Sequence, residues 1–252
     1  MKIYSIIMQK ILTILLISLL AEKSYSQLTD STKTNFSVNG AITVTNSGIS
    51  VIPTFTLGKP AAIFDFILRK KNFSFEPQFR FAIEDFKPWS YIFWMRYKIT
   101  NGKKFKMGIG VHPSTVFANS VITENGVSKE IITVRRYWAG DLNPTIILSK
   151  NVSLGIYYLY ARGLGEAAKN TNFVALNTNF SNITLTNNLI LKASPQLYYL
   201  NIAQNDGYYF TSTFILERKN FPVTLSSIIN KKIESNIPSE DFVWNMSLTY
   251  AF

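Results

Sequence analysis

The sequence predicts an all-β protein, an antiparallel up-and-down β-barrel that crosses a membrane with about twelve strands. Three observations lead to this fold class. Apolar and polar residues alternate with a period of two, the N-terminus has the layout of a secretory signal peptide, and no later stretch is apolar enough for a membrane-spanning helix. A chain that enters a membrane without such a helix must use strands that close on themselves.

The first 26 residues are predicted to be a cleaved signal peptide. Lys2 and Lys10 precede the apolar run 11–20, and the small-x-small pattern 24–26 follows it. A spanning helix needs roughly 20 apolar residues, about twice the length of this run, so an anchor helix is not expected. Cleavage after Ser26 removes three lysines and one glutamate, which lowers the formal charge from +11 to +9 (11 − 3 + 1).

Composition excludes several classes of protein. The chain has no cysteine, so disulfide-stapled domains, lipid anchors on cysteine and zinc–thiolate sites are excluded. The positive charge does not indicate a nucleic-acid partner, because the basic residues are not gathered on one element. Many lie as pairs in turn-like positions between apolar segments, as in 70–71, 103–104 and 231–232.

Residues 48–252 are predicted to form the barrel. In the clearest segment, Phe73–Glu84, rings occupy one face and charges the other, as a strand allows and a helix does not. Trp and Tyr residues near strand ends, such as Trp89 and Trp138, are expected to lie outside in interfacial girdles. The twelve predicted strands cover residues 49–58, 61–69, 73–84, 89–100, 105–114, 132–149, 152–163, 173–183, 189–202, 208–218, 222–230 and 242–252.

The connections support this count. From residue 101 onward tight turns alternate with longer connections, which are predicted at 115–130, 164–170, 203–207 and 231–241. Outer-membrane barrels have short turns on one side and longer loops on the other, with an even number of strands. Ten or fourteen strands result if a segment is divided differently. Residues 36–46 also alternate but would add a thirteenth strand, so residues 27–47 are predicted to be an N-terminal arm, either in the periplasm or folded into the lumen.

The last predicted strand resembles the terminal strand of bacterial outer-membrane barrels, which ends in an aromatic residue that the insertion machinery reads. The resemblance implies an exported protein of a Gram-negative outer membrane whose partners are the barrel-insertion machinery, lipid and lipopolysaccharide. In general style the chain resembles the small barrels of the Bacteroidota envelope. The residues that would form the membrane-insertion signal are Trp244, Met246, Leu248, Tyr250 and Phe252.

A soluble β-sandwich would also show a two-residue period. Its core is only about 10 Å thick, which leaves little room for an apolar face that is large and aromatic in nearly every strand. The other face mixes charge and glycine with bulky residues such as Trp94, Tyr157 and Tyr198, which suits the inside of a narrow barrel better than a water-exposed surface. The barrel is therefore preferred.

The polar face supplies the candidate site. If residues 84–90 set the hairpin register, Glu76 lies opposite Lys98, and Trp94 lies opposite Gly110, where glycine makes room for the ring. The residues predicted to line the lumen are Asp65, Arg69, Glu76, Arg80, Glu84, Trp94, Arg96, Lys98, Lys106, His112, Arg135 and Asp141.

Two functions fit such a lumen. The first is a narrow passive channel or solute-uptake protein, since twelve strands give a modest bore. The alternative is a closed structural or accessory envelope barrel, whose interior is filled by its own ion pairs and which acts through other proteins. Solute and protein partners are left open.

A third function, lipid hydrolysis, rests on a motif of three residues. His112-Pro113-Ser114 resembles the His-x-Ser spacing of the outer-membrane phospholipase family, whose barrels also have twelve strands. Here Pro113 interrupts the motif, and the alternation turns both side chains to the lumen, whereas that family works at the lipid-facing side. No catalytic residue, metal or cofactor is therefore expected, and the protein is predicted not to be an enzyme.

Overall fold

A computed structural model describes residues 36–124, 127–165 and 169–252. The predicted signal peptide and residues 27–35 of the predicted arm lie outside them. Within these ranges no helix is long and apolar enough to cross a membrane. The elements are one 3₁₀ turn, η1 (Pro53–Phe55), and the strands β1 (Phe36–Thr45), β2 (Ala61–Lys70), β3 (Phe73–Ala82), β4 (Pro88–Asn101), β5 (Phe105–Glu124), β6 (Val127–Leu142), β7 (Thr145–Ile147), β8 (Val152–Leu164), β9 (Asn170–Thr186), β10 (Leu189–Ile202), β11 (Asn205–Arg218), β12 (Val223–Ser235) and β13 (Phe242–Ala251).

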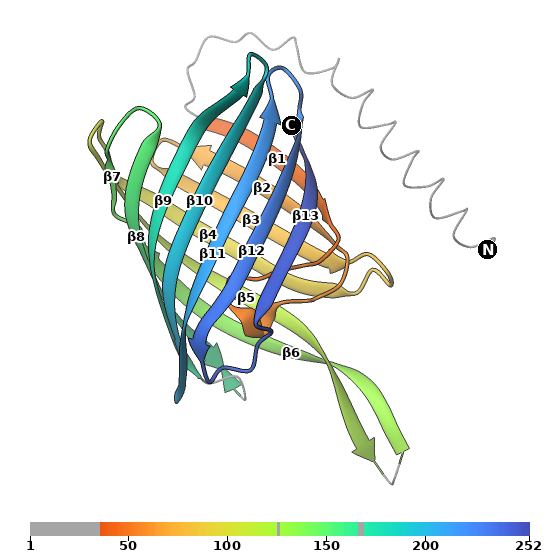
Figure 1. Cartoon of the computed structure of the whole chain (residues 1–252). Helices are drawn as coiled ribbons and strands as arrows, with labels where there is room; N and C mark the ends of the chain where they lie inside the picture. Colours follow the sequence, from red (N-terminus) through yellow and green to blue (C-terminus); the bar gives the residue numbers. More distant parts are fainter. Residues whose placement is uncertain (1–35, 125–126, 166–168) are drawn as a thin grey trace, which may run out of the picture. The chain divides into compact units, whose positions relative to one another are not determined.

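The strands form one closed antiparallel sheet (Figure 1). Except for β6 and β7, strands that follow one another in the chain are paired, and β1 pairs with β13 from Ala41↔Ala251 to Thr45↔Ser247, which closes the barrel. The short β7 continues the line of β6, because both lie between β5 and β8 and only residues 143–144 separate them. The barrel therefore has twelve strand positions, and the predicted fold class and number are confirmed.

The two ends of the barrel differ. Turns at 71–72, 102–104, 148–151, 187–188 and 219–222 lie at the end where β1 begins and β13 ends, which we call the short-turn end. The connections 46–60, 83–87 and 236–241 lie at the opposite end, as do Gly165 and Lys169 between β8 and β9, and we call this the loop end. The connection predicted at 203–207 is only the two-residue turn 203–204, with Ala203 at a φ of 56°.

The first strand differs from the prediction. The segment Phe36–Thr45, part of the predicted N-terminal arm, is β1 and pairs along its whole length with β2. The segment 49–58, predicted to be the first strand, instead belongs to the loop between β1 and β2. Pro53 begins η1 there, and Gly48 bonds back to Leu57 and Lys59 within the same loop. The count of twelve survives because one strand replaces the other.

The segment 115–130, predicted to be a loop, is mostly strand. β5 and β6 pair from Ile109↔Leu142 to Glu124↔Val127. β4 pairs with β5 only as far as Val116, and β8 pairs with β6 only from Arg136. The remainder is a two-stranded hairpin that extends beyond the wall, as Figure 1 shows.

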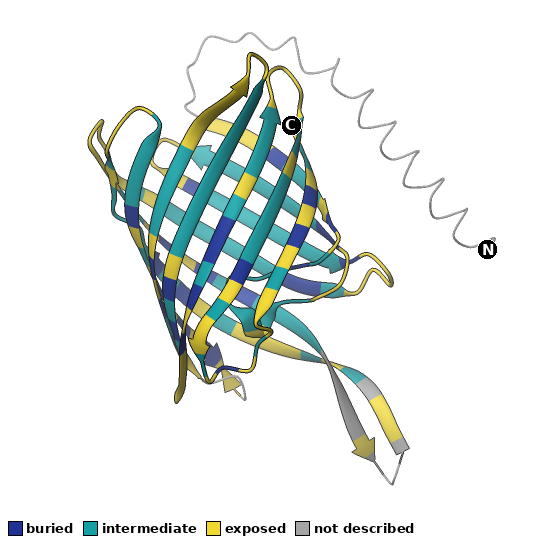
Figure 2. Ribbon diagram, in the orientation of Figure 1, coloured by how far each residue is buried: buried dark blue, intermediate teal, exposed yellow. Residues whose placement is uncertain are grey.

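The outer surface is apolar and the inner one polar. Along β13 the apolar side chains Trp244 and Met246 are 50% and 48% exposed, whereas Asn245 and Ser247 between them are 4% and 7% exposed. Figure 2 shows buried and exposed residues alternating along the strands. A protein folded in water buries apolar groups and exposes polar ones, so this inversion indicates that the outside faces lipid.

Candidate functional site: the lumen

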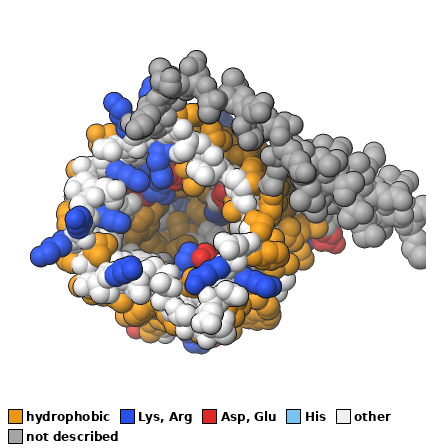
Figure 3. Space-filling model, turned by 90° about the horizontal axis from the view of Figure 1, so that it is seen from above, with side chains coloured by type: hydrophobic (Ala, Val, Ile, Leu, Met, Phe, Trp, Pro, Cys, Tyr) orange, Lys and Arg blue, Asp and Glu red, His pale blue; other side chains and the backbone are white. Residues whose placement is uncertain are grey.

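The barrel is hollow at the short-turn end. Figure 3 shows the opening, with lysine and arginine side chains around it. The five turns at this end and the residues that flank them carry seven bases and no acid: Lys70, Lys71, Lys103, Lys104, Lys150, Arg218 and Lys219. This set is called the basic rim. The loop end carries both signs of charge, with Glu84, Asp85, Glu240 and Asp241 among its acids.

Arg96 is the centre of a charged cluster on the inner wall. Its Nη1 lies 2.5 Å from Asp141 Oδ2, and its Nε lies 3.2 Å from Glu76 Oε2. Ser74 donates a 2.7 Å hydrogen bond to the other oxygen of Glu76, which Arg69 approaches to 3.7 Å. The cluster links β2, β3, β4 and β6, so its charge-assisted contacts join a third of the twelve strand positions.

Aromatic rings and a glycine complete this cluster. The Arg96 guanidinium lies 3.7 Å from the centre of the Trp94 ring, and His112 packs on the same ring with the two centres 4.0 Å apart. At Gly110 a β-carbon would come within 2.6 Å of Asp141 Oδ1 and 3.1 Å of Trp94. Glycine there lets the Trp94 ring and the Arg96–Asp141 pair approach the backbone. The expectation that a glycine accommodates Trp94 was right.

The predicted register was wrong by four residues between β3 and β4 and by two residues between β4 and β5. Glu76 lies opposite Trp94, and Gly110 lies opposite Arg96. The main cause in the first hairpin is the position of its turn, because β3 ends at Ala82 and β4 begins at Pro88. An irregularity changes the pairing by one residue, where Arg80 pairs with Ser90 but Phe81 with Pro88. Such a bulge re-aims a side chain. The extra residue is Trp89, which was predicted to lie in the outer girdle and is instead 3% exposed, with its indole N–H donating to Phe55 O at 2.8 Å.

A cavity of about 270 Å³ adjoins the Arg96 cluster toward the short-turn end. Its charged lining comes from four neighbouring strands and consists of Arg69, Glu76, Arg96, Lys98 and Lys106. Hydrogen-bonding side chains complete the lining, among them Thr100, Asn143 and Thr145. Asn143 lies at the break between β6 and β7, and its Oδ1 accepts the Gly108 N–H at 2.8 Å.

Two smaller polar groups line other parts of the wall. Gln78 donates to Asp65 and accepts a 2.6 Å hydrogen bond from Arg80, whose guanidinium lies 4.9 Å from the Trp89 ring centre. Across the barrel, Lys192 and Glu217 form an ion pair at 2.6 Å. The charged side chains of these two groups are thus tied to partners in the wall, as buried charges require.

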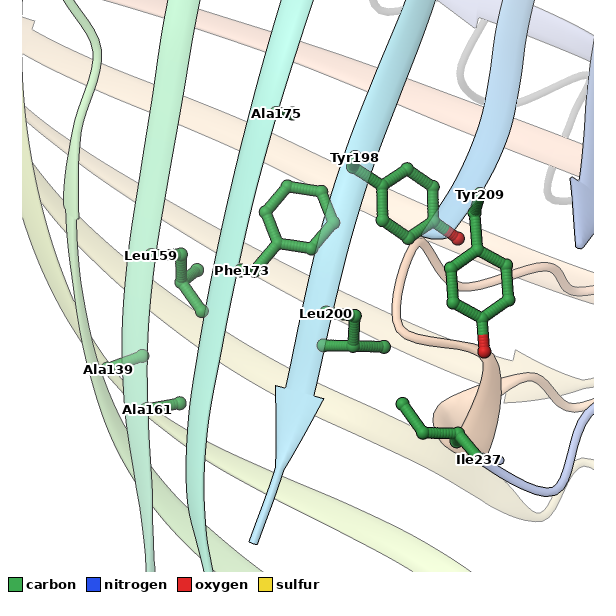
Figure 4. Close-up of a cluster of buried hydrophobic side chains, with 9 residues drawn as sticks. All are labelled: Ala139, Leu159, Ala161, Phe173, Ala175, Tyr198, Leu200, Tyr209 and Ile237. Carbon is green, nitrogen blue, oxygen red and sulfur yellow. The ribbon is translucent and has the colours of Figure 1, made fainter. Parts of the chain in front are cut away.

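An aromatic row covers the inner wall of β8 to β11. The ring centres of Tyr157 and Phe173 are 5.9 Å apart, those of Phe173 and Tyr198 4.9 Å, and those of Tyr198 and Tyr209 4.9 Å. Figure 4 shows Phe173, Tyr198 and Tyr209 on adjacent strands, with Ile237 beneath Tyr209. Hydrogen bonds from Tyr209 to Ser235 and from Asn230 to Tyr198 satisfy the hydroxyl groups of Tyr209 and Tyr198.

The loop 46–60, here called the inner segment, crosses the lumen near the loop end. On one side Phe55 contacts Trp89 on β4 and Tyr137 on β6, with 5.1 Å between the ring centres of Phe55 and Tyr137. On the other side Ile52 packs against the aromatic row, and Pro53 and Thr56 share a cavity of about 50 Å³ with Tyr209 on β11. Because β4 and β11 are six positions apart in a ring of twelve, the segment touches opposite walls.

An ion pair ties the loop 236–241 beside the inner segment. Lys232 Nζ lies 2.7 Å from Asp241 Oδ1 and donates to Ser239 O at 3.1 Å. The hydrogen bond from Lys232 holds the pKa of Asp241 below its ordinary value. This loop carries Ile237, which is 2% exposed and packs in the same cluster as Tyr209. Both the inner segment and this loop therefore narrow the loop end.

Most residues predicted to line the lumen lie on the inner wall. The exceptions are Glu84, which lies in the turn after β3 with its side chain 72% exposed and 3.9 Å from Lys59, and Arg135, which is exposed where the hairpin leaves the wall. Those that line the wall are Asp65, Arg69, Glu76, Arg80, Trp94, Arg96, Lys98, Lys106, His112 and Asp141.

The remaining predictions concern catalysis and insertion. His112 and Ser114 are both buried and joined by no hydrogen bond, and within the described ranges no group of three acid or histidine side chains could hold a metal ion. The expected insertion signal lies on β13, where Trp244, Met246 and Leu248 are half exposed on the outer face. Its role as a signal stays a prediction.

Sequence reasoning missed the inner segment and the partners of the charged residues. Ser74, Gln78 and Asn143 carry no signal that separates them from other polar strand residues. The inner segment carried a signal in the sequence, because Pro53 interrupts the predicted strand 49–58 and a proline breaks the hydrogen-bond ladder of a central strand.

The comparisons with known proteins concern the fold. No protein-family model and no curated protein matches the chain. A solved structure of the KdgM porin in complex with disordered oligogalacturonate has a TM-score of 0.53 and 10% identity, over 85% of this chain and 98% of its own. An outer-membrane channel from Pseudomonas putida F1 has a TM-score of 0.52 and 11% identity, over 91% of this chain and 98% of its own. The chain therefore has the fold of bacterial outer-membrane β-barrels.

Proposed function

We propose that this protein is a narrow passive channel for small solutes in the outer membrane of a Gram-negative bacterium. The observation that carries the proposal is a closed barrel that is apolar outside and hollow and charged inside (Figure 3). The inner segment is the constriction, because it joins opposite walls at the loop end. Two structures with the same fold are described as a porin and as an outer-membrane channel, which supports the proposal.

The outward face supports membrane residence. An apolar strand face that is half exposed over much of the barrel would be an aggregation hazard in water, and in lipid it is the expected surface. In barrels of this type short turns lie in the periplasm, so the basic rim would face the periplasm and the inner segment the outside.

The second candidate is the closed accessory barrel. The observation that favours it is the inner segment itself, since Trp89 and the aromatic row hold it from two sides. A channel and a closed barrel differ in one measurable property, the passage of ions.

Conductance in planar lipid bilayers tests the proposal. We expect small, steady openings from the purified barrel. A variant in which residues 49–57 are replaced by a short Gly-Ser linker should give a severalfold larger conductance, because the contacts with Trp89, Tyr137 and Tyr209 are lost. Heat-dependent migration on a detergent gel reports for both proteins that the barrel is closed.

A variant with a shortened hairpin, lacking residues 118–133, serves as the control. Those residues pair only with each other, so their removal should leave the conductance unchanged. Silence of both the parent and the 49–57 variant, with intact heat-dependent migration, would reject the channel in favour of the closed accessory barrel.

A further inference from the structure

We propose that the cavity next to Arg96 is a binding site for a small solute that carries two or more oxyanion groups, such as carboxylates or phosphates. The proposal names a solute class for the channel and rests on that function for its physiological role. Binding itself does not require conduction, so the two can fail separately.

The charge of the cavity is the first argument. Its four bases, Arg69, Arg96, Lys98 and Lys106, come from β2, β4 and β5. Among the residues that the structure describes, two acids oppose them, Glu76 in the lining and Asp141 behind Arg96, so two positive charges are left over (4 − 2).

The excess charge belongs to two lysines. Asp141 forms an ion pair with Arg96, and Glu76 forms ion pairs with Arg96 and Arg69. Glu76 Oε1 also accepts a hydrogen bond from Ser74. Within the described part of the chain neither the Lys98 nor the Lys106 ammonium group has an ion-pair or hydrogen-bond partner. They lie on adjacent strands, and Gly108, the residue opposite Lys98 on β5, is two positions from Lys106 on the same inner face. Two ammonium groups on one wall are suited to two anionic groups of one solute.

The lining also supplies neutral hydrogen bonds. Asn143 uses Oδ1 to accept from the Gly108 backbone, which leaves its amide NH₂ group as a donor beside the cavity. Thr100, Asn101 and Thr145 add further polar groups. At about 270 Å³ the cavity is slightly below the usual range for drug-sized ligands, roughly 300–1,000 Å³, so it fits a small metabolite-sized solute.

The basic rim is the second, independent argument. Seven bases without an acid surround the opening at the same end as the cavity. A mouth of one charge with low-dielectric walls concentrates ions of the opposite charge and speeds their entry. The rim would gather anions at the opening, and the cavity would hold them.

Calorimetric titration of the purified barrel in non-ionic detergent tests the site. The probes are citrate, inorganic pyrophosphate, monovalent acetate and uncharged sucrose. We expect saturable binding of citrate or pyrophosphate, no detectable binding of acetate or sucrose, and weaker binding as the salt concentration rises. The double variant Lys98→Gln/Lys106→Gln should weaken binding at least tenfold.

Two control variants make the test specific. Lys169→Gln removes a base at the loop end and should leave affinity unchanged. Lys98→Arg/Lys106→Arg keeps the charge and should retain binding within a few fold. Heat-dependent migration confirms folding of each variant.

The site is overturned if neither citrate nor pyrophosphate binds, if acetate binds as well as they do, or if the double Gln variant binds like the parent. Binding by a barrel that is silent in planar bilayers would support the site and reject the channel. Steady openings without binding of citrate or pyrophosphate would support the channel and reject the site.

Discussion

At the scale of single residues, Arg96 connects the strands of the inner wall beside the cavity through its side-chain contacts. It contacts Asp141, Glu76 and Trp94. The Asp141 side chain is fully buried, whereas that of Arg96 keeps 27% exposure toward the lumen. Loss of the ion pair should therefore cost more at Asp141 than at Arg96, because the Asp141 carboxylate has no access to water and the Arg96 guanidinium does.

Asp141→Asn should destabilise the barrel by about 1–3 kcal/mol, the range for leaving a hydrogen-bonded group without its charged partner. The amide is nearly isosteric, so the loss reports the charge rather than the packing. Urea unfolding followed by tryptophan fluorescence in detergent micelles measures it. Asp206→Asn, at an exposed position, is the matched control. Equal stability of Asp141→Asn and the parent would show that the pair contributes nothing.

The orientation of these residues could be predicted from the sequence, and their contacts could not. The two-residue period places Arg96, Lys98 and Lys106 on the inner face from the sequence alone. Contacts across strands depend on register, and one extra residue at Trp89 shifts the pairing of β3 with β4. A bulge of this kind cannot be recognised from the alternation of apolar and polar residues around it.

At the scale of elements, the strands owe their membrane stability to the outward rows. Leu176 on β9 lies between Ile156 on β8 and Leu197 on β10, and the three side chains are 50%, 51% and 54% exposed. These side chains replace the core of a soluble protein, with lipid as the second layer.

Leu176→Arg should destabilise the folded barrel in lipid by up to about 2–4 kcal/mol, the cost of a base at the bilayer midplane of such barrels. Gln196→Arg places the same charge on the inner face of the neighbouring strand and should cost much less. The comparison is made by unfolding in liposomes. Equal losses for the two variants would contradict the assignment of the faces.

The identity of the first strand shows where element prediction fails. The residues of β1 and those of 49–58 both alternate, so periodicity alone does not choose between them. Closure decides: β1 pairs with both β2 and β13, whereas Phe55 and Ile52 of the inner segment find contacts inside the lumen. Such long-range pairing cannot be predicted from the local sequence pattern.

At the scale of the whole molecule, closure depends on β1. Without it β2 and β13 would each present an open edge, and an unpaired edge in lipid costs several kcal/mol for each exposed backbone group. The hairpin formed by β5 and β6 beyond the wall is different, because its outer residues pair only with each other.

Deletion of residues 36–45 should therefore abolish the compact band that shifts only on boiling in a detergent gel. Deletion of residues 118–133 should preserve it. A compact band for the first deletion would mean that an eleven-strand barrel closes without β1.

Spin labelling tests the central assignment most directly, namely that the apolar face meets hydrocarbon and the charged face lines an aqueous lumen. The chain has no cysteine, so single cysteines at Leu176, Leu197, Lys192 and Gln196 each carry one label. In liposomes we expect labels at 176 and 197 to relax with membrane-soluble oxygen, and those at 192 and 196 with a water-soluble nickel complex. Nickel access at 176 and 197, with oxygen access at 192 and 196, would contradict the assignment.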